Sequence, residues 1–299
     1  MAIIINEKTK VLVQGITGRT GSFATRYMLE YGTNVVGGVT PGRQGEKVWG
    51  VPVHNTVADA KREHGPIDTS LITVPGDIVK NAVLEAIEAD IKTIVMPVER
   101  VPLHDILEMI SYSKQKNVKM VGPGSFGVIS PRKAVIGWIG GSLELAEEAY
   151  KLGRIGVISR SGGQTTTVSW NISKSGLGIS TAIHVGAEAI IGLTEAEILP
   201  LFQEDPGTDA VALFGEIGTV QEEEAADIIQ EGKFTKPLVA YIAGARLPTG
   251  IRYSHASAMV ERGKGSAESK TKALKSAGAH VVDKPEEIGF TLSQLVKNL

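Results

Sequence analysis

The sequence of 299 residues contains no cysteine, which excludes disulfides, thiolate metal sites and a cysteine nucleophile. It also lacks an excess of charge. With 31 basic and 33 acidic residues its formal net charge is −2, so electrostatics favour neither nucleic acid nor an anionic membrane. No apolar run reaches the roughly 20 residues needed to cross a bilayer, and the apolar stretch in the N-terminal MAIIINEKTK is too short for a secretory signal. We expect a soluble cytoplasmic protein.

Glycine, by contrast, is abundant at 35 residues, as is typical of α/β proteins with many tight strand-to-helix turns. Strand-like apolar runs alternate with helical stretches along the chain, which predicts parallel sheets covered by helices on both faces. In the first half we expect strands at 10–14, 34–39, 69–74, 92–98 and 118–122, and helices at 21–31, 56–64, 78–88 and 103–116.

The alternation is interrupted after Gly122-Pro123-Gly124, and residues 134–148 are predicted to be a connector with a short helix. We place a domain boundary near residue 145, which gives domains 1–145 and 146–299. The pattern restarts at Gly153, with strands at 154–159, 180–184, 210–215, 236–242 and 279–282, and helices at 163–174, 194–203, 221–231, 266–277 and 285–297.

The first predicted βαβ unit carries a glycine-rich turn with G-x-x-G-x-x-G spacing, at Gly15, Gly18 and Gly21. Its second strand ends in Thr40-Pro41-Gly42-Arg43, where an NAD site would need an acidic residue for the ribose hydroxyl. A basic residue suits a ligand with an extra ribose phosphate, such as CoA or NADP. The alternative is that the glycines only allow the helix to pack closely on the strand.

Three features of the second half follow predicted strands, where ligands bind in parallel sheets. Ser159 to Thr165 precede a helix and form either an anion site or an ordinary N-cap. Glu216 lies between two glycines and is either an orienting carboxylate or a solvated one. His255 lies among small residues and is either a nucleophile towards phosphorus or a surface histidine. As a nucleophile it needs a carboxylate and an anion cradle, which Glu216 and the Ser159–Thr165 turn can supply.

Several motifs in one order together resemble the α-subunit of succinyl-CoA synthetase (succinate–CoA ligase). They are QGITGRTGSF, YGTNVVGGVTPGR, GVPVHNTV, IGVISRSG, LFQEDPGTDAV, GEIG, KPLVAYIAG and SHASA followed by GKG. The resemblance implies an α/β fold, with an N-terminal Rossmann-like CoA-binding domain followed by a flavodoxin-like parallel ligase domain. It also implies an NDP-forming acid–CoA ligase of the tricarboxylic acid cycle type, active as a hetero-oligomer with an ATP-grasp β-subunit.

The resemblance also assigns roles to residues. His255 matches the phosphorylated histidine and Glu216 the glutamate that holds it. The CoA contacts correspond to Thr17, Gly18, Arg19, Thr20, Arg43, Pro97, Val98 and Glu99. The phosphate and substrate side corresponds to Ser159, Ser161, Gly162, Gly163 and Thr166. No metal site is expected in this chain, because its sequence shows no cluster of metal ligands, and ATP or GTP with Mg²⁺ would lie mainly in the partner.

The chain departs from the family near these positions. SRSGGQTTT replaces the usual SRSGTLTYE, and GPGSFG, with Phe126, replaces GPNCPG. The first variant is also similar to ATP-citrate lyase, so succinate, malate and citrate all stay open as the acid. Two further alternatives are a CoA-binding or regulatory subunit without phosphoryl transfer and an NADP-linked oxidoreductase.

Overall fold

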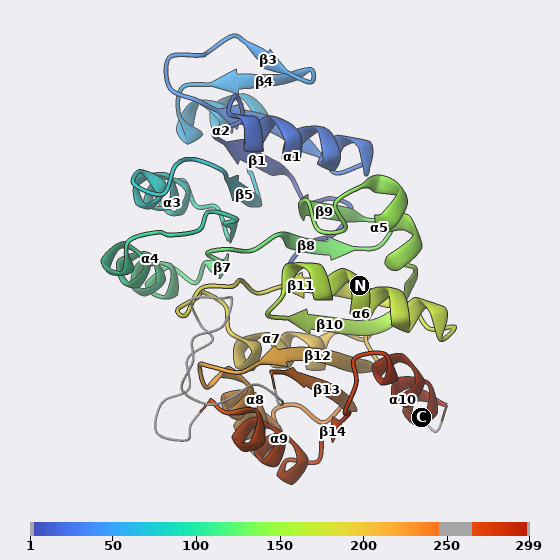
Figure 1. Cartoon of the computed structure of the whole chain (residues 1–299). Helices are drawn as coiled ribbons and strands as arrows, with labels where there is room; N and C mark the ends of the chain where they lie inside the picture. The colour runs from blue at the N-terminus through green and yellow to red at the C-terminus, as the bar shows by residue number, and fades with distance from the viewer. Residues whose placement is uncertain (1–2, 245–264, 298–299) are drawn as a thin grey trace.

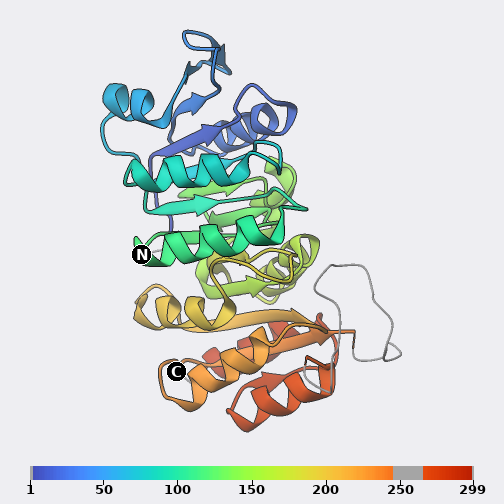
Figure 2. The same ribbon diagram turned by 90° about the vertical axis from the view of Figure 1, so that its left-hand side faces the viewer.

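The computed structural model describes residues 3–244 and 265–297, which build two stacked α/β units (Figure 1). Turned by 90°, the same view shows an elongated molecule with the N-terminal unit at one end and the C-terminal helices at the other (Figure 2). No described helix is both long and apolar enough to cross a bilayer.

The first unit contains a seven-stranded sheet in the order β3-β4-β2-β1-β5-β6-β7. Only β3 is antiparallel, and the six parallel strands follow the 3-2-1-4-5-6 order of dinucleotide-binding folds. The predicted Rossmann-like fold is therefore confirmed. The strands are β1 (Val11–Gln14), β2 (Val35–Val39), β3 (Lys47–Val48), β4 (Val51–His54), β5 (Thr69–Ile72), β6 (Thr93–Val95) and β7 (Lys119–Val121).

Four helices connect these strands and cover the sheet. They form where apolar side chains recur at helical spacing, as in α3, which buries Val79, Val83 and Ile87 on one face. Thr56 caps α2 by accepting a hydrogen bond from the Asp59 amide. The helices are α1 (Arg19–Glu30), α2 (Val57–His64), α3 (Val79–Glu88) and α4 (Leu103–Gln115).

The second unit contains a seven-stranded sheet in the order β14-β13-β12-β10-β11-β8-β9. Its five parallel strands follow the 2-1-3-4-5 order of flavodoxin-like folds, which confirms the second predicted fold. The strands are β8 (Gly127–Ser130), β9 (Ala134–Gly137), β10 (Leu152–Ser159), β11 (Ile179–His184), β12 (Ala210–Glu216), β13 (Leu238–Ala243) and β14 (His280–Val281). The helices are α5 (Leu143–Ala149), α6 (Gly162–Lys174), α7 (Glu195–Glu204), α8 (Gln221–Gln230), α9 (Ala267–Ser276) and α10 (Glu287–Val296).

The segment predicted as a connector is more structured than expected, and the second sheet is mixed rather than purely parallel. β8 and β9 form an antiparallel hairpin, and β8 pairs with β11. Both strands are fully buried and only four residues long, so neither shows the alternation that marks an exposed hairpin. Sheet membership thus changes between Val121 and Gly127, and the domain boundary near residue 145 stays a prediction.

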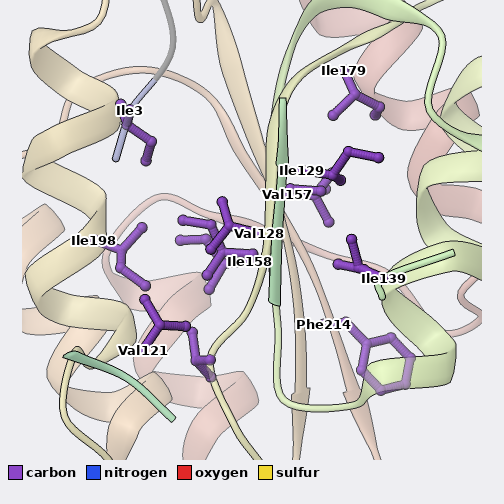
Figure 3. Packing of buried hydrophobic residues seen from close by; sticks show 14 of the residues in the cluster. Ile3, Val121, Val128, Ile129, Ile139, Val157, Ile158, Ile179, Ile198 and Phe214 are labelled. Carbon is purple, nitrogen blue, oxygen red and sulfur yellow. The ribbon is translucent and has the colours of Figure 1, made fainter. Parts of the chain in front are cut away.

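One apolar core runs through both units. Figure 3 shows Val121 of β7 in the same cluster as Val128 of β8, Ile158 of β10 and Ile198 of α7. Polar contacts support the junction, because the Tyr27 hydroxyl of α1 donates a hydrogen bond to the Ile139 carbonyl at 2.6 Å. The two units are therefore held firmly against each other.

Candidate functional site

Each sheet has one point where the strand order reverses, and open α/β sheets bind ligands there, beyond the carboxyl ends of the strands. In the first sheet this point lies between β1 and β5. In the second it lies between β10 and β12. The predicted site residues outside 245–264 follow strand ends at or beside these two points.

At the first point, α1 begins directly after Gly18 and exposes its first backbone amides. Its first turn contains no acidic residue, and no side chain caps it. Arg19 and Thr20 are exposed at this helix start, and the Thr17 hydroxyl donates a hydrogen bond to that of Thr40 at 3.1 Å. Such a helix start suits a pyrophosphate, because its amide groups and dipole both favour an anion.

The glycines of this turn allow close packing, and they also leave the helix start open. A Cβ at Gly21 would lie 2.2 Å from the Gly15 carbonyl oxygen, so Gly21 is required for close packing of α1 on the loop. Gly15 has a backbone φ of +80°, a value that residues with a side chain rarely adopt. Gly18 caps the helix without closing off its amides.

The other proposed CoA contacts lie along the same edge of the first sheet. Arg43 is exposed after β2, and its Nε lies 2.9 Å from Glu46 Oε1. Pro97, Val98 and Glu99 follow β6, and the Val98 carbonyl accepts a hydrogen bond from the Gly124 amide at 2.9 Å. The hydrogen bond between Val98 and Gly124 brings the 97–99 loop to the junction with the second unit.

At the second point, the turn from β10 into α6 is locked by one side chain. The Ser159 hydroxyl donates to the Ser161 carbonyl at 2.9 Å and accepts from the Ser161 amide at 3.1 Å. Helix α6 then starts at Gly162 without a side-chain cap and without an acidic residue in its first turn. This second helix start therefore also suits an anion, and Gly163 in its first turn is exposed.

An apolar cavity of about 520 Å³ adjoins the start of α6. Phe126 forms one wall, and its ring lies so close to Gly162 that a Cβ there would be 2.4 Å from a ring carbon. Thr166 lines the cavity and shares a 2.8 Å hydrogen bond with the Tyr150 hydroxyl. The departures from the family pattern at Phe126 and Thr166 therefore both shape this one cavity.

Glu216 ends β12 beside this turn and is almost buried. Its Oε1 lies 3.9 Å from Nε of Arg160, whose side chain is fully buried. Arg160 Nη2 donates to the Glu188 carbonyl at 3.1 Å, whereas its Nε and Nη1 have no hydrogen-bond partner among the described residues. A buried guanidinium with unused donors is costly unless an anion is near, which makes Arg160 a candidate anion ligand.

His184 holds the backbone of this turn. Its Nδ1 accepts a hydrogen bond from the Phe126 amide at 2.8 Å, so its Nε2 carries the proton and donates to the Arg160 carbonyl at 3.1 Å. The imidazole therefore ties the hairpin β8–β9 to the loop that carries Arg160.

The buried ion pair between Lys270 and Glu222 holds the backbone of Glu216. Lys270 Nζ donates to the carbonyls of Glu216 at 2.7 Å and Gly218 at 2.6 Å, and it is paired with the Glu222 carboxylate. The other oxygen of Glu222 accepts from the Glu216 amide at 2.8 Å. Both backbone polar groups of Glu216 are thus fixed by charged side chains.

Glu195, at the start of α7, is a second fully buried acid near this site. Neither carboxylate oxygen has a hydrogen-bond partner among the described residues. Burial raises the pKa of Glu195 well above its ordinary value, and the carboxylate of Glu222 raises it further, against the opposing effects of Lys270 and Arg160. The folded chain therefore keeps a proton that the unfolded chain releases.

This proton predicts a stability that falls as the pH rises above about 4.3, the ordinary pKa of glutamate. Replacing Glu195 with glutamine removes this titration. The free energy of unfolding of E195Q, relative to that of the unaltered chain, should therefore be higher at pH 8 than at pH 5 by about 1 kcal/mol or more. Urea unfolding at both pH values measures this, with E204Q at the exposed end of α7 as the control. An E195Q effect that is the same at both pH values would contradict the assignment.

His255, the predicted nucleophile, lies outside the described residues. The structure brings together four groups that sequence reasoning missed, namely Arg160, Glu195, Glu222 and Lys270. Arg160 was visible as part of the SRSGG motif. The other three lie in amphipathic helical segments where their letters look like ordinary surface charge, so no local signal identified them.

Comparison with known proteins finds two families, one matching each half of the chain. Residues 6–99 match the CoA binding domain family, and residues 158–280 match the CoA-ligase family. An ADP-forming sulfoacetate-CoA ligase subunit from Acholeplasma sp is 44% identical over 99% of this chain and 98% of its own length. A succinate–CoA ligase [ADP-forming] subunit alpha from Aquifex aeolicus is 43% identical over 99% of this chain and 95% of its own.

Among solved structures, ATP citrate lyase from Methanothrix soehngenii matches with a TM-score of 0.91 over 99% of this chain, at 24% identity. This chain corresponds to 51% of that larger chain. At this identity the likeness shows the shared fold alone. A CoA-binding domain followed by a CoA-ligase domain defines an acid–CoA ligase. More closely, the chain belongs to the succinate–CoA ligase α-subunit family, which also includes sulfoacetate–CoA ligase subunits.

Proposed function

We propose that this chain is the α-subunit of an NDP-forming acid–CoA ligase that works through a phosphorylated His255, together with an ATP-grasp β-subunit. The observation that carries the proposal is the set of groups at the point where the strand order of the second sheet reverses. There, an uncapped helix start, a buried arginine with unused donors and a rigidly held glutamate converge. A phosphohistidine needs an anion cradle and a carboxylate partner, and these are the groups that supply them.

The first unit fits CoA as the acyl acceptor. The amides at the start of α1 would hold the pyrophosphate, and Arg43 would meet the ribose phosphate once it exchanges Glu46 for the ligand. Pro97, Val98 and Glu99 would line the path toward the second unit, because their loop contacts Gly124. When bound, CoA supplies the thiol for the thioester.

In the proposed reaction, His255 attacks the terminal phosphorus of ATP or GTP; an N–P bond forms and the bond to the leaving diphosphate breaks. A substrate carboxylate oxygen then takes the phosphoryl group, which frees the imidazole. Attack of the thiol on the acyl carbon releases inorganic phosphate. Glu216 would orient His255 by accepting its second N–H, while Arg160 and the α6 amides stabilise the phosphoryl oxygens.

We propose a short acid with a second anionic group as the substrate. Succinate carries a second carboxylate, and sulfoacetate carries a sulfonate. The relative named for succinate and the relative named for sulfoacetate are almost equally similar to this chain. Phe126 and Thr166 alter the wall beside α6, so they are the residues expected to set the preference.

The test uses the chain reconstituted with its β-subunit and ATP labelled at the γ-phosphate. The α chain should acquire an acid-labile label, and addition of CoA and the correct acid should discharge it. H255A should abolish labelling completely, while H104A, an exposed histidine on α4, should label normally. Labelling that persists in H255A would refute the mechanism.

A further inference from the structure

Two histidines and a glutamate meet where the end of β4 packs against the end of α2 in the first unit. His54 ends β4, and His64 ends α2. Their Nε2 atoms lie 3.1 Å apart, and Glu63 oxygens lie 3.8 Å from His54 Nδ1 and 4.0 Å from His64 Nε2. One ring nitrogen from each histidine and one carboxylate oxygen all fall within 4.8 Å of one another.

The fold creates this meeting place. Gly37 of β2 lies directly beneath the two rings, and a Cβ there would lie 3.3 Å from His64 Cδ2 and 3.4 Å from His54 Nε2. The side chains of His54 and His64 are 5% and 19% exposed, whereas Glu63 is 61% exposed. The two rings are thus held in place by packing, and the carboxylate is free to adjust.

We propose that His54, His64 and Glu63 bind a divalent transition metal of the Zn²⁺ class, with water completing the coordination. Two imidazoles and a carboxylate are a donor set that suits Zn²⁺, and this chain has no thiolate to compete with them. The sequence predicts no metal site, because these residues follow no familiar ligand spacing. The pairing exists only after β4 and α2 have packed together.

The ring geometry fits a tetrahedral ion. Two nitrogen ligands at about 2.05 Å from Zn²⁺ lie roughly 3.3 Å apart, close to the 3.1 Å between the two Nε2 atoms. One Glu63 oxygen must move roughly 0.7 Å closer to His64 Nε2 to reach this spacing, which its exposure permits.

The ion would join the end of β4 to the end of α2. Binding to the folded chain alone stabilises it by mass action, so Zn²⁺ should raise the unfolding temperature of the first unit. This role does not involve Arg160 or Glu216, which belong to the second unit.

The test is equilibrium dialysis of the chelator-stripped full-length chain against Zn²⁺, with Co²⁺ absorption as a report of tetrahedral coordination. One equivalent should bind, and E63Q and H64Q should each weaken binding at least about tenfold. The matched controls E88Q and H104Q, both exposed, should bind as the unaltered chain does. H255Q should also retain the site, which separates this proposal from the phosphohistidine mechanism.

Absence of saturable binding, or equal binding by E63Q and the unaltered chain, would overturn the proposal. E63Q carries the test even where H64Q fails to fold, because the exposed Glu63 contributes little to packing.

Discussion

Replacing Lys270 with methionine is expected to lower the free energy of unfolding by about 3–5 kcal/mol. Lys270 is fully buried, and its ammonium satisfies the Glu222 carboxylate and the carbonyls of Glu216 and Gly218. Methionine fills a similar volume but donates no hydrogen bond. The variant therefore leaves a buried, uncompensated carboxylate and two unsatisfied carbonyls, which is the costly way to break a buried pair.

Urea unfolding followed by circular dichroism measures this loss, with K272M as the matched control. Lys272 is exposed on the same helix, so its replacement should change stability by no more than about 0.5 kcal/mol. The double variant K270M/E222Q should recover part of the loss, because it removes the stranded charge. A loss below about 1 kcal/mol in K270M, or no recovery in the double variant, would contradict the buried-pair interpretation.

Replacing Arg160 with methionine is expected to lower acyl-CoA formation by the reconstituted enzyme about 100-fold or more. The Arg160 Nε lies 3.9 Å from the Glu216 carboxylate, and the unused donors of the guanidinium are available to the phosphoryl oxygens in the proposed mechanism. Loss of one pre-organised donor to developing charge typically costs about 10²–10³ in rate. R160K keeps the charge without the fork of donors and should retain an intermediate activity.

The control is R154M, on the same strand β10. Arg154 is 55% exposed and pairs with Asp209 at the surface, so its replacement should leave the rate nearly unchanged. Phosphorylation of the α chain should slow in parallel with turnover in R160M, while the circular dichroism spectrum stays that of the folded chain. An R160M rate within threefold of R154M would remove Arg160 from the site.

The helices and parallel strands of both units were largely predictable because each carries its signal locally. Buried strands such as 154–159 read as short apolar runs, and α3 shows its buried face in its spacing. The hairpin β8–β9 was missed because its short strands are buried on both sides and lie between glycine-rich turns. Only pairing with β11, about 50 residues further along the chain, makes it part of a sheet.

The two phosphate-type helix starts were also predictable, since each follows a buried strand and opens with glycine. Parallel topology then places both at sheet edges, where ligands bind. The cavity beside α6 was not predictable, because it combines Phe126, Trp138 and Thr166 from three separate segments.

By itself, the sequence determined the family, the order of the two α/β units and the loops that end their strands, because these depend on neighbouring residues and on periodicity. Only the tertiary structure decided which charges are buried together. Arg160 meets Glu216, Lys270 meets Glu222, and His54 meets His64 across elements whose separation along the chain carries no pairing signal. A buried charge or imidazole needs a partner, and packing, rather than sequence proximity, supplies it.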